Sequence, residues 1–472
     1  MILGSLIDEI ARQAERATDT VSEHLFEPTI RLGVSGLSRS GKTVFITSLV
    51  ANLLDRGRMP QFSANAQGRI SSVFLQPQPD DTVPRFAYET HLAAMTGVKP
   101  VWPQSTRSVS QLRLSFRVQP KGIISGLRGP KTVHLDIVDY PGEWLLDLPL
   151  LNLSFAKWSE QSLALAKGRK THAKKFLKLM SNVDTSTQLD ELVAQNLAQT
   201  FTEYLSASRD AGYSACAPGR FLMPGDLEGS PALTFCPLPM GVDKRGSLYR
   251  EFSRRYEAYK AKVIKPFFRD HFVRIDRQIV LVDVLGAVHH GPSAVEDLKL
   301  AMVDVLQAFK PGKNTWLGSV LGQKRVEKIL FAATKADHLH HSQHSRLEAL
   351  MQAMVRGAKD RAEFSGAKTS SVALASLRTT VEESRKHNGT VLDCVRGTLL
   401  ETGKEALMYA GELPEDPTEL LSAAQGGADK WLDADYSVMR FAPAKITLKQ
   451  GMGPPHIRLD KAVEFLLGDR LV

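Results

Sequence analysis

The chain has 472 residues, about three times the length of a typical single domain, so two or three folding units are expected. With 43% hydrophobic and 24% charged residues it is too apolar to be disordered, and its ordinary glycine and proline content excludes collagen-like and low-complexity classes. The formal net charge of +9 is spread thinly along the sequence, so we expect no nucleic-acid partner and at most peripheral contact with a membrane.

The three cysteines, Cys216, Cys236 and Cys394, lack the spacing of a zinc or redox motif, and their number excludes a disulfide framework. Charged residues interrupt the N-terminal segment, and no apolar run reaches the roughly 18 residues that a membrane-spanning helix needs. These features predict a soluble, cytoplasmic protein.

Residues 2–25 are predicted to form an amphipathic helix, because apolar side chains recur there at steps of three and four. This helix could dock on its own domain, or it could bind a partner or a membrane surface. Its polar face mixes acidic and basic residues, which favours docking on its own domain.

After Pro28, short apolar runs alternate with helical patterns, which is typical of a parallel-sheet α/β domain. A predicted strand at 30–35 and a predicted helix at 43–54 flank Gly36-Leu37-Ser38-Arg39-Ser40-Gly41-Lys42-Thr43. The octapeptide matches the phosphate-binding pattern G-x-x-x-x-G-K-(S/T) in the strand–loop–helix context that this motif requires.

The chemistry of this loop follows from its residue types. Gly36 and Gly41 let backbone N–H groups surround a β-phosphate, together with those of Ser38, Arg39 and Ser40. Lys42 supplies a positive charge to the β- and γ-phosphates, and Thr43 offers a hydroxyl to Mg²⁺. We therefore predict a nucleoside triphosphate site.

Two strands with alternating or continuous apolar residues, 112–118 and 133–139, are predicted to form a hairpin. The second strand ends in Asp139-Tyr140-Pro141-Gly142, which resembles the D-x-x-G switch of GTPases. That resemblance implies that Asp139 reaches Mg²⁺ through water and that the Gly142 N–H senses the γ-phosphate. Thr106, in the loop before residue 112, is a candidate for a second switch residue that binds Mg²⁺, with Ser105 and Ser108 as alternatives.

From residue 143 to about 275 the strand pattern largely disappears, which predicts a helical insertion. Helices are expected around 167–178, 189–205 and 248–268, the last bent at Pro266. The basic run from Lys167 to Lys178 could meet phosphates, but a solvated helix face is favoured because aromatic residues are sparse there.

Later strands are predicted at 278–284, 328–334 and 371–377. Thr334-Lys335-Ala336-Asp337 follows the second of them and matches the (N/T)-K-x-D pattern that selects guanine in GTPases. A carboxylate at Asp337 can accept from both guanine N–H groups, whereas adenine offers no such pair of donors. The stem of Lys335 would cover the ring, and Ala375-Ser376 could present a backbone N–H to the base oxygen.

Four histidines crowd the segment after Asp337, namely His338, His340, His341 and His344. His340 and His344 have helical spacing and could act as metal ligands. A surface or helix-start cluster is favoured, because no carboxylate-rich counterpart is evident nearby in the sequence.

The chain as a whole resembles the bacterial YcjX family of P-loop NTPases. The resemblance is carried by the phosphate loop with Phe45-Ile46-Thr47-Ser48-Leu49, by Leu112-Arg113-Leu114, by Asp139–Trp144, by Thr334–His341 and by Ile457–Ala462. It implies a Ras-like core and a suggested link to stress response. The family's description leaves the base open between adenine and guanine, so the Thr334–Asp337 pattern is the reason to predict GTP.

Two residues are candidates for the hydrolytic step besides Lys42. Glu143 follows Gly142, where many GTPases of this class place a water-orienting glutamine, although its negative charge would lie near the γ-phosphate. Arg39 resembles the P-loop arginine that guanylate-binding proteins and atlastins use as an internal arginine finger. An arginine directed at solvent or at a partner is the alternative.

We predict an α/β P-loop NTPase with a Ras-like sheet flanked by helices, an inserted helical domain and a C-terminal extension. The predicted divisions are an N-terminal helix (1–28), a P-loop GTPase domain in two parts (29–145 and 276–385), a helical insertion (146–275) and the extension (386–472). The predicted activity is binding of Mg-GTP and its hydrolysis to GDP and phosphate as a conformational switch. Two alternative activities stay open, an ATPase with the same phosphate site and a nucleotide-dependent scaffold with vestigial hydrolysis. The partner could be an unidentified protein or a second copy of the chain.

Overall fold

The computed structural model describes residues 27–37, 39–104, 108–120, 129–307, 326–364, 366–426 and 436–471. Its centre is a seven-stranded sheet in the order β2-β3-β4-β1-β5-β6-β7. These strands are β1 (Thr29–Gly36), β2 (Ile70–Gln76), β3 (Ser110–Val118), β4 (Lys131–Asp139), β5 (Arg277–Val282), β6 (Lys328–Ala333) and β7 (Lys368–Ala373). Within this sheet β3 runs antiparallel to both of its neighbours, and β4, β1, β5, β6 and β7 pair in parallel.

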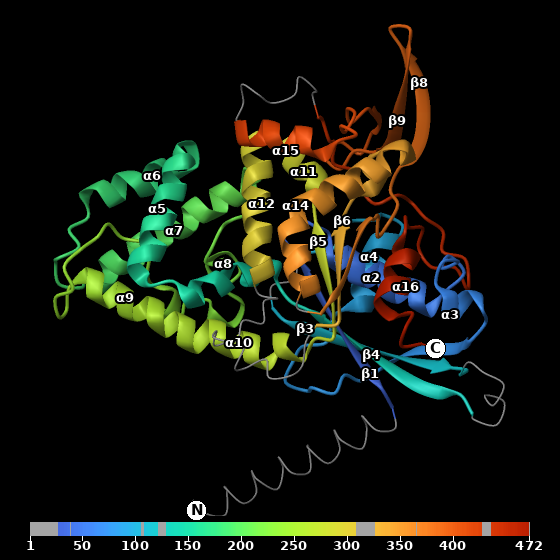
Figure 1. Ribbon diagram of the computed structural model, residues 1–472, viewed down its shortest axis with the longest axis horizontal. Helices are drawn as coiled ribbons and strands as arrows, with labels where there is room; N and C mark the ends of the chain where they lie inside the picture. Colours follow the sequence, from blue (N-terminus) through green and yellow to red (C-terminus); the bar gives the residue numbers. More distant parts are fainter. Residues whose placement is uncertain are drawn as a thin grey trace, which may run out of the picture.

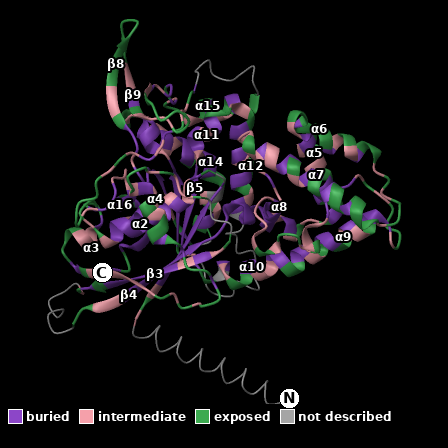
Figure 2. Cartoon of the chain, turned by 180° about the vertical axis from the view of Figure 1, so that it is seen from behind, coloured by how far each residue is buried: buried purple, intermediate pink, exposed green. Residues whose placement is uncertain are grey.

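This sheet confirms the predicted α/β class, and the antiparallel pairing of β3 with β4 confirms the predicted hairpin. The central strands are apolar on both faces because helices cover both sides. In β5, Ile279 and Leu281 belong to one hydrophobic core, whereas Val280 and Val282 belong to the other. Figure 2 shows the buried strands at the centre of the molecule.

One face of the sheet is covered by α2 (Lys42–Leu54), α4 (Tyr88–Thr96) and the C-terminal α16 (Leu459–Leu467) (Figure 1). The side chain of Asp460 accepts a hydrogen bond from the Gln61 N–H at 3.0 Å, and Arg69 donates to the Leu471 carbonyl at 2.6 Å. The end of the chain therefore packs back on the phosphate-loop half of the sheet.

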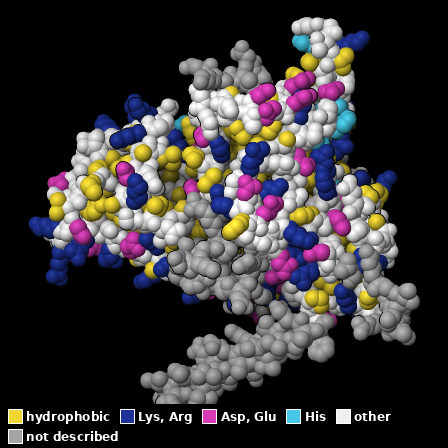
Figure 3. Space-filling model, in the orientation of Figure 1, with side chains coloured by type: hydrophobic (Ala, Val, Ile, Leu, Met, Phe, Trp, Pro, Cys, Tyr) yellow, Lys and Arg dark blue, Asp and Glu magenta, His cyan; other side chains and the backbone are white. Residues whose placement is uncertain are grey.

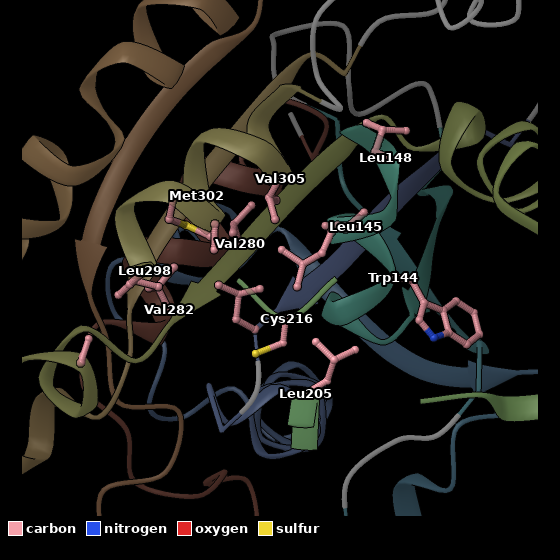
Figure 4. Packing of buried hydrophobic residues seen from close by; sticks show 14 of the residues in the cluster. Trp144, Leu145, Leu148, Leu205, Cys216, Val280, Val282, Leu298, Met302 and Val305 are labelled. Atoms are coloured by element: carbon pink, nitrogen blue, oxygen red, sulfur yellow. The ribbon is translucent and has the colours of Figure 1, made fainter. Parts of the chain in front are cut away.

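The other face is covered by α11 (Val284–His289), α12 (Pro292–Gln307) and α14 (His344–Phe364), and α15 (Pro417–Gly426) packs on α12 and α14. Figure 4 shows Val280 and Val282 facing Leu298 and Met302 of α12, with Leu145 alongside. Leu145 belongs to η2 (Gly142–Asn152), a 3₁₀ helix that follows β4.

A block of helices lies between β4 and β5 in the sequence and beside the sheet in space (Figure 1). It contains α5 (Phe155–Gly168), α6 (Lys170–Asn182), α7 (Glu191–Asp210), α8 (Gly219–Leu222), α9 (Leu248–Tyr259) and α10 (Lys265–Asp270). Aromatic rings fill its interior: Trp158 stacks on Tyr256 with ring centroids 4.9 Å apart. The boundaries that the sequence suggested for the domains stay predictions.

Two details of this block correct the sequence prediction. The expected 167–178 helix is interrupted at Arg169, which is buried and pairs with Asp297 of α12, so this member of the basic run is not on a solvated face. A bend was expected at Pro266, but the helix departs from α-helical geometry about one turn earlier. A π-helical turn at Lys260–Ile264 joins α9 to α10, and Pro266 lies in the first turn of α10.

A second, antiparallel sheet of three strands has the order β10-β9-β8, with β8 (Val381–His387), β9 (Thr390–Thr398) and β10 (Glu405–Met408). The β8–β9 hairpin projects from the molecule as an arm (Figure 1). Asn388 and Gly389 form its turn with φ angles of 48° and 83°.

Throughout the described ranges, none of the helices has both the length and the apolar character that crossing a bilayer requires. The helix predicted at 2–25 lies outside those ranges.

Candidate functional site

The phosphate loop leaves β1 at Gly36 and enters α2 at Lys42. Arg39 and Gly41 have positive φ angles of 64° and 79°, which turn the chain tightly and direct the start of α2 toward the loop. A Cβ on Gly36 would lie 2.2 Å from the Ser40 hydroxyl oxygen, so this position has no room for a side chain. Ser38, which the sequence also assigned to this site, lies outside the described residues.

Lys42 and Asp139 meet at this loop. The Lys42 Nζ lies 2.5 Å from Asp139 Oδ1, and the Asp139 side chain is 1% exposed. Asp139 ends β4, which pairs in parallel with β1, so the two motifs stand at the same edge of the sheet.

The Thr43 hydroxyl and the Asp139 carboxylate are both buried at this edge and are oxygen donors of the kind that Mg²⁺ prefers. These residues therefore fit the predicted ion. Thr106, the third predicted ligand, lies outside the described residues.

The first glycine of the phosphate loop and the glycine of the Asp139–Gly142 segment are in direct backbone contact. A Cβ on Gly142 would lie 2.0 Å from the Gly36 carbonyl oxygen. A side chain at residue 142 would therefore force the two loops apart.

Gly142 is also the first residue of η2, which is almost entirely buried. Glu143, its second residue, has 8% exposure, and burial raises the pKa of its carboxyl, opposed by Lys42 and Arg209. Asp147 accepts hydrogen bonds from the Gly219 N–H and the Tyr259 hydroxyl, both at 2.6 Å. Burial raises the pKa of Asp147 to about 6.

A stacking contact adds a further link between η2 and the helical block: the Arg220 guanidinium of α8 lies 3.2 Å from the ring centroid of Trp144. The segment that follows Asp139 is thus joined to α8 and α9 by hydrogen bonds and by a cation–π contact.

Arg39 is directed toward the C-terminal end of α7. Its Nη2 lies 3.5 Å from the Oδ1 of Asp210, which also lies 3.7 Å from Arg209. About half of the Arg39 side chain is exposed, so this ion pair is weak. The structure therefore places the predicted finger residue between the phosphate loop and the helical block.

The predicted base-selecting segment, Thr334–Asp337, follows β6, and the Thr334 N–H donates to the Val282 carbonyl of β5 at 2.9 Å. Lys335 has a positive φ of 60°, and its ammonium pairs with Asp283. Because β1, β5 and β6 are adjacent and parallel, this segment and the phosphate loop lie at the same edge of the sheet.

Asp337 is 4% exposed and is held by residues that the sequence analysis did not single out. The N–H and the hydroxyl of Thr379 both donate to Asp337 Oδ2, at 2.8 Å and 2.7 Å, and the Thr380 hydroxyl donates to the Asp337 carbonyl. The two threonines and Asp283 were missed. An acidic residue directly after the buried β5 strand was the available signal for Asp283.

The predicted contact of Ala375-Ser376 with the base oxygen stays a prediction for Ser376. The Ala375 N–H donates to the Ile457 carbonyl at 3.1 Å, so this amide is engaged by the C-terminal segment. Ser376 is 9% exposed and lies between β7 and Thr379.

Among the histidines, His344 is buried at the start of α14, and its Nε2 lies 2.8 Å from the Ala336 carbonyl oxygen. His338 is also buried, which lowers the pKa of its imidazole. The predicted helix-start placement therefore fits His344, whereas His340 and His341 lie just before α14 at the base of the β8–β9 arm.

The strand–loop–helix at Gly36–Thr43, the acidic residue at the end of the neighbouring strand and the mixed sheet flanked by helices define a P-loop NTPase with a Ras-like fold. The model of the YcjX-like family, DUF463, matches residues 30–471. A protein of Escherichia coli K12 named "Ras-like GTPase YcjX" is 38% identical over 460 residues, which cover 94% of this chain and 96% of that protein. A protein of the same name from Shewanella oneidensis MR-1 is 33% identical over 469 residues, 94% of each chain. The chain belongs to the YcjX-like family.

Proposed function

We propose that this protein is a GTPase that binds Mg-GTP at the sheet edge formed by β4, β1, β5 and β6 and uses its hydrolysis as a conformational switch. The observation that carries the proposal is the buried carboxylate of Asp337. Two hydrogen bonds from Thr379 hold this carboxylate at the edge of the sheet where the phosphate loop also lies. The names of the two relatives support the same choice of nucleotide.

The base would be selected by Asp337, whose carboxylate accepts from two N–H groups of guanine. Thr379 holds this carboxylate in one orientation, so little ordering remains to be done when the base binds. Adenine presents no matching pair of donors, so its binding would desolvate the carboxylate without supplying the two hydrogen bonds that guanine supplies.

The phosphate chain would be bound by the backbone of residues 36–43 and by Lys42. Lys42 would exchange its contact with Asp139 for the β- and γ-phosphates, which leaves the Asp139 carboxylate available near Thr43. Bound there by Thr43 and Asp139, Mg²⁺ would neutralise negative charge on the phosphate oxygens.

Glu143 would orient the attacking water. The burial that raises the pKa of its carboxyl favours the neutral form, which removes the repulsion expected between an ionised carboxylate and the γ-phosphate. Arg39 would supply positive charge in the transition state once it leaves Asp210.

The conformational change on hydrolysis would be transmitted to the helical block through η2. Gly142 touches the phosphate loop, and the same 3₁₀ helix is bonded to Gly219 and Tyr259 through Asp147. A change at the γ-phosphate therefore has a short, packed route to α8 and α9.

The proposal is tested by identifying the nucleotide that co-purifies with the protein and by measuring phosphate release from GTP and ATP. We expect guanine nucleotide and slow release from GTP that Lys42→Ala abolishes. Bound adenine nucleotide, or preferential hydrolysis of ATP, would contradict the proposal.

A second candidate is a nucleotide-dependent scaffold with vestigial hydrolysis. The deep burial of Glu143 beneath Gly219, whose added Cβ would lie 1.9 Å from the Glu143 carbonyl oxygen, favours it. GTP binding without phosphate release in single-turnover experiments would select this candidate.

A further inference from the structure

A cluster of metal-ligand side chains lies at the base of the β8–β9 arm. His340 and His341 come from the segment that follows the base-selecting loop, and Glu382 comes from β8. These three residues each offer one ligand atom, and the three atoms lie within 4.8 Å of one another. Figure 3 shows histidine and acidic side chains along this part of the arm. We call His340, His341 and Glu382 the His–Glu cluster.

The geometry of the His–Glu cluster is close to that of a coordination shell. Glu382 Oε2 lies 2.7 Å from His341 Nδ1 and 3.8 Å from His340 Nε2. In a tetrahedral zinc site, bonds of about 2.0–2.1 Å place neighbouring ligand atoms about 3.4 Å apart, a value between these two. Small side-chain movements would therefore bring all three atoms to bonding distance of one ion.

A neighbouring carboxylate lies beside one of the imidazoles. Asp393 of β9 lies 3.3 Å from His340 Nδ1, and Ser342 contacts the same nitrogen through its hydroxyl at 2.9 Å and through its N–H, which donates to it at 3.4 Å. These contacts are on the ring nitrogen opposite to the one that faces Glu382. With a metal on Nε2, Nδ1 would carry the proton and would donate it to Asp393, a contact that fixes the ring and strengthens it as a ligand.

Two acidic side chains and one basic side chain surround the cluster. Glu382 and Asp393 attract a cation, whereas Arg378 lies 3.8 Å from the other oxygen of Glu382 and opposes it. His340 is 12% exposed and His341 is 68% exposed, so one side of the cluster is open to solvent.

We propose that His340, His341 and Glu382 bind a transition-metal ion, with Zn²⁺ the best match to two imidazoles and one carboxylate. Asp393 is the positioning residue that orients His340. Water from the open side would complete the coordination. No acidic partner is evident near these histidines in the sequence, but the fold brings Glu382 and Asp393 to them from β8 and β9.

The ion would join two segments that form the base pocket. His340 lies three residues after Asp337, and Glu382 lies two residues after Thr380, which bonds the Asp337 carbonyl. A metal bridge would therefore hold the Asp337 loop against the Thr379–Thr380 segment. This consequence rests on the proposed function, whereas the metal site itself does not.

The site is tested by isothermal titration of Zn²⁺ into the full chain, purified without a histidine tag and treated with a chelator. We expect one equivalent to bind, with the metal replacing the contact between His341 and Glu382. His341→Gln and Glu382→Gln should abolish that binding, and Asp393→Asn should weaken it by about 10- to 100-fold.

His387→Gln, on the exposed part of β8 in the same arm, is the matched control and should bind Zn²⁺ as the wild type does. Thermal unfolding of each variant checks that the arm is intact. Absence of binding to the wild type, or equal affinity in wild type, His341→Gln and Glu382→Gln, would overturn the proposal.

A separate measurement addresses the link to the base pocket. Dissociation of labelled GDP should slow when Zn²⁺ is bound to the wild type and should not change in Glu382→Gln. If Zn²⁺ binds but the GDP rate is unaltered, the bridge consequence is wrong and the metal site stands. If GDP does not bind at all, the proposed function fails, and the titration still decides the metal site.

Discussion

Replacing Thr379 with valine tests whether Asp337 is held ready for the base. Valine has nearly the shape of threonine but lacks the hydroxyl that donates to Asp337 Oδ2 at 2.7 Å, while the backbone N–H at 2.8 Å remains. Thr379 and Asp337 are both buried, so water cannot easily replace the lost donor. This hydrogen bond is present before GDP binds, so its loss lowers affinity through the lost ordering of the carboxylate. Ordering one side chain costs about 0.5–1.5 kcal/mol, and GDP affinity should therefore fall by about 2- to 10-fold.

The assay is competition of GDP and ADP against a fluorescent guanine nucleotide at equilibrium. Thr379→Val should weaken GDP binding and leave the affinity for ADP unchanged, so the preference for GDP over ADP becomes smaller. Thr379→Ser keeps the hydroxyl and is the matched control, with affinity close to that of the wild type. Wild-type GDP affinity in Thr379→Val would refute the reasoning that this hydroxyl orients the base-selecting carboxylate.

The other residues of the site give three further predictions. Arg39→Ala should leave GTP affinity nearly unchanged and lower turnover by about 100-fold, because an arginine finger acts mainly in the transition state; equal turnover would reduce Arg39 to its contact with Asp210. Because burial raises the pKa of Glu143, wild-type turnover should fall as pH rises and the carboxyl ionises, whereas Glu143→Gln should show no such fall; a flat wild-type profile argues against a neutral Glu143. Asp147 has a folded-state pKa of about 6, above its unfolded value near 3.9, so its contribution to stability is present below pH 4 and is lost as pH rises through 6. The free energy of unfolding of the wild type relative to Asp147→Asn should therefore decrease by up to about 3 kcal/mol from pH 4 to pH 7, and parallel denaturation curves across that range would contradict this.

Sequence patterns predicted the central strands of the sheet because those strands are apolar on both faces. All six residues of β5 and of β6 are buried, and such runs are recognisable without tertiary information. The β8–β9 arm was missed because β8 is mostly polar and exposed and therefore lacks an apolar run. Its turn, Asn388-Gly389, is a strong hairpin signal that the strand composition obscured.

The functional site also contains residues that the sequence predicts and residues that only the tertiary fold brings together. Lys42, Asp139 and Asp337 were predicted because each lies in a short local motif at the end of a strand. Thr379 is 42 residues from Asp337, and Asp210 is 171 residues from Arg39, so these contacts depend on the tertiary fold. The acidic partners of His340 and His341 are likewise supplied by a different element of the chain.

Base selection by Asp337 is the central claim, and one substitution tests it most directly. Asp337→Asn replaces an acceptor with an amide that can donate to the O2 of xanthine and can no longer accept from both guanine N–H groups. Equilibrium affinities for GDP, XDP and ADP should show the wild type preferring GDP and Asp337→Asn preferring XDP. Equal affinity of the wild type for GDP and ADP, or unchanged GDP preference in Asp337→Asn, would contradict the account.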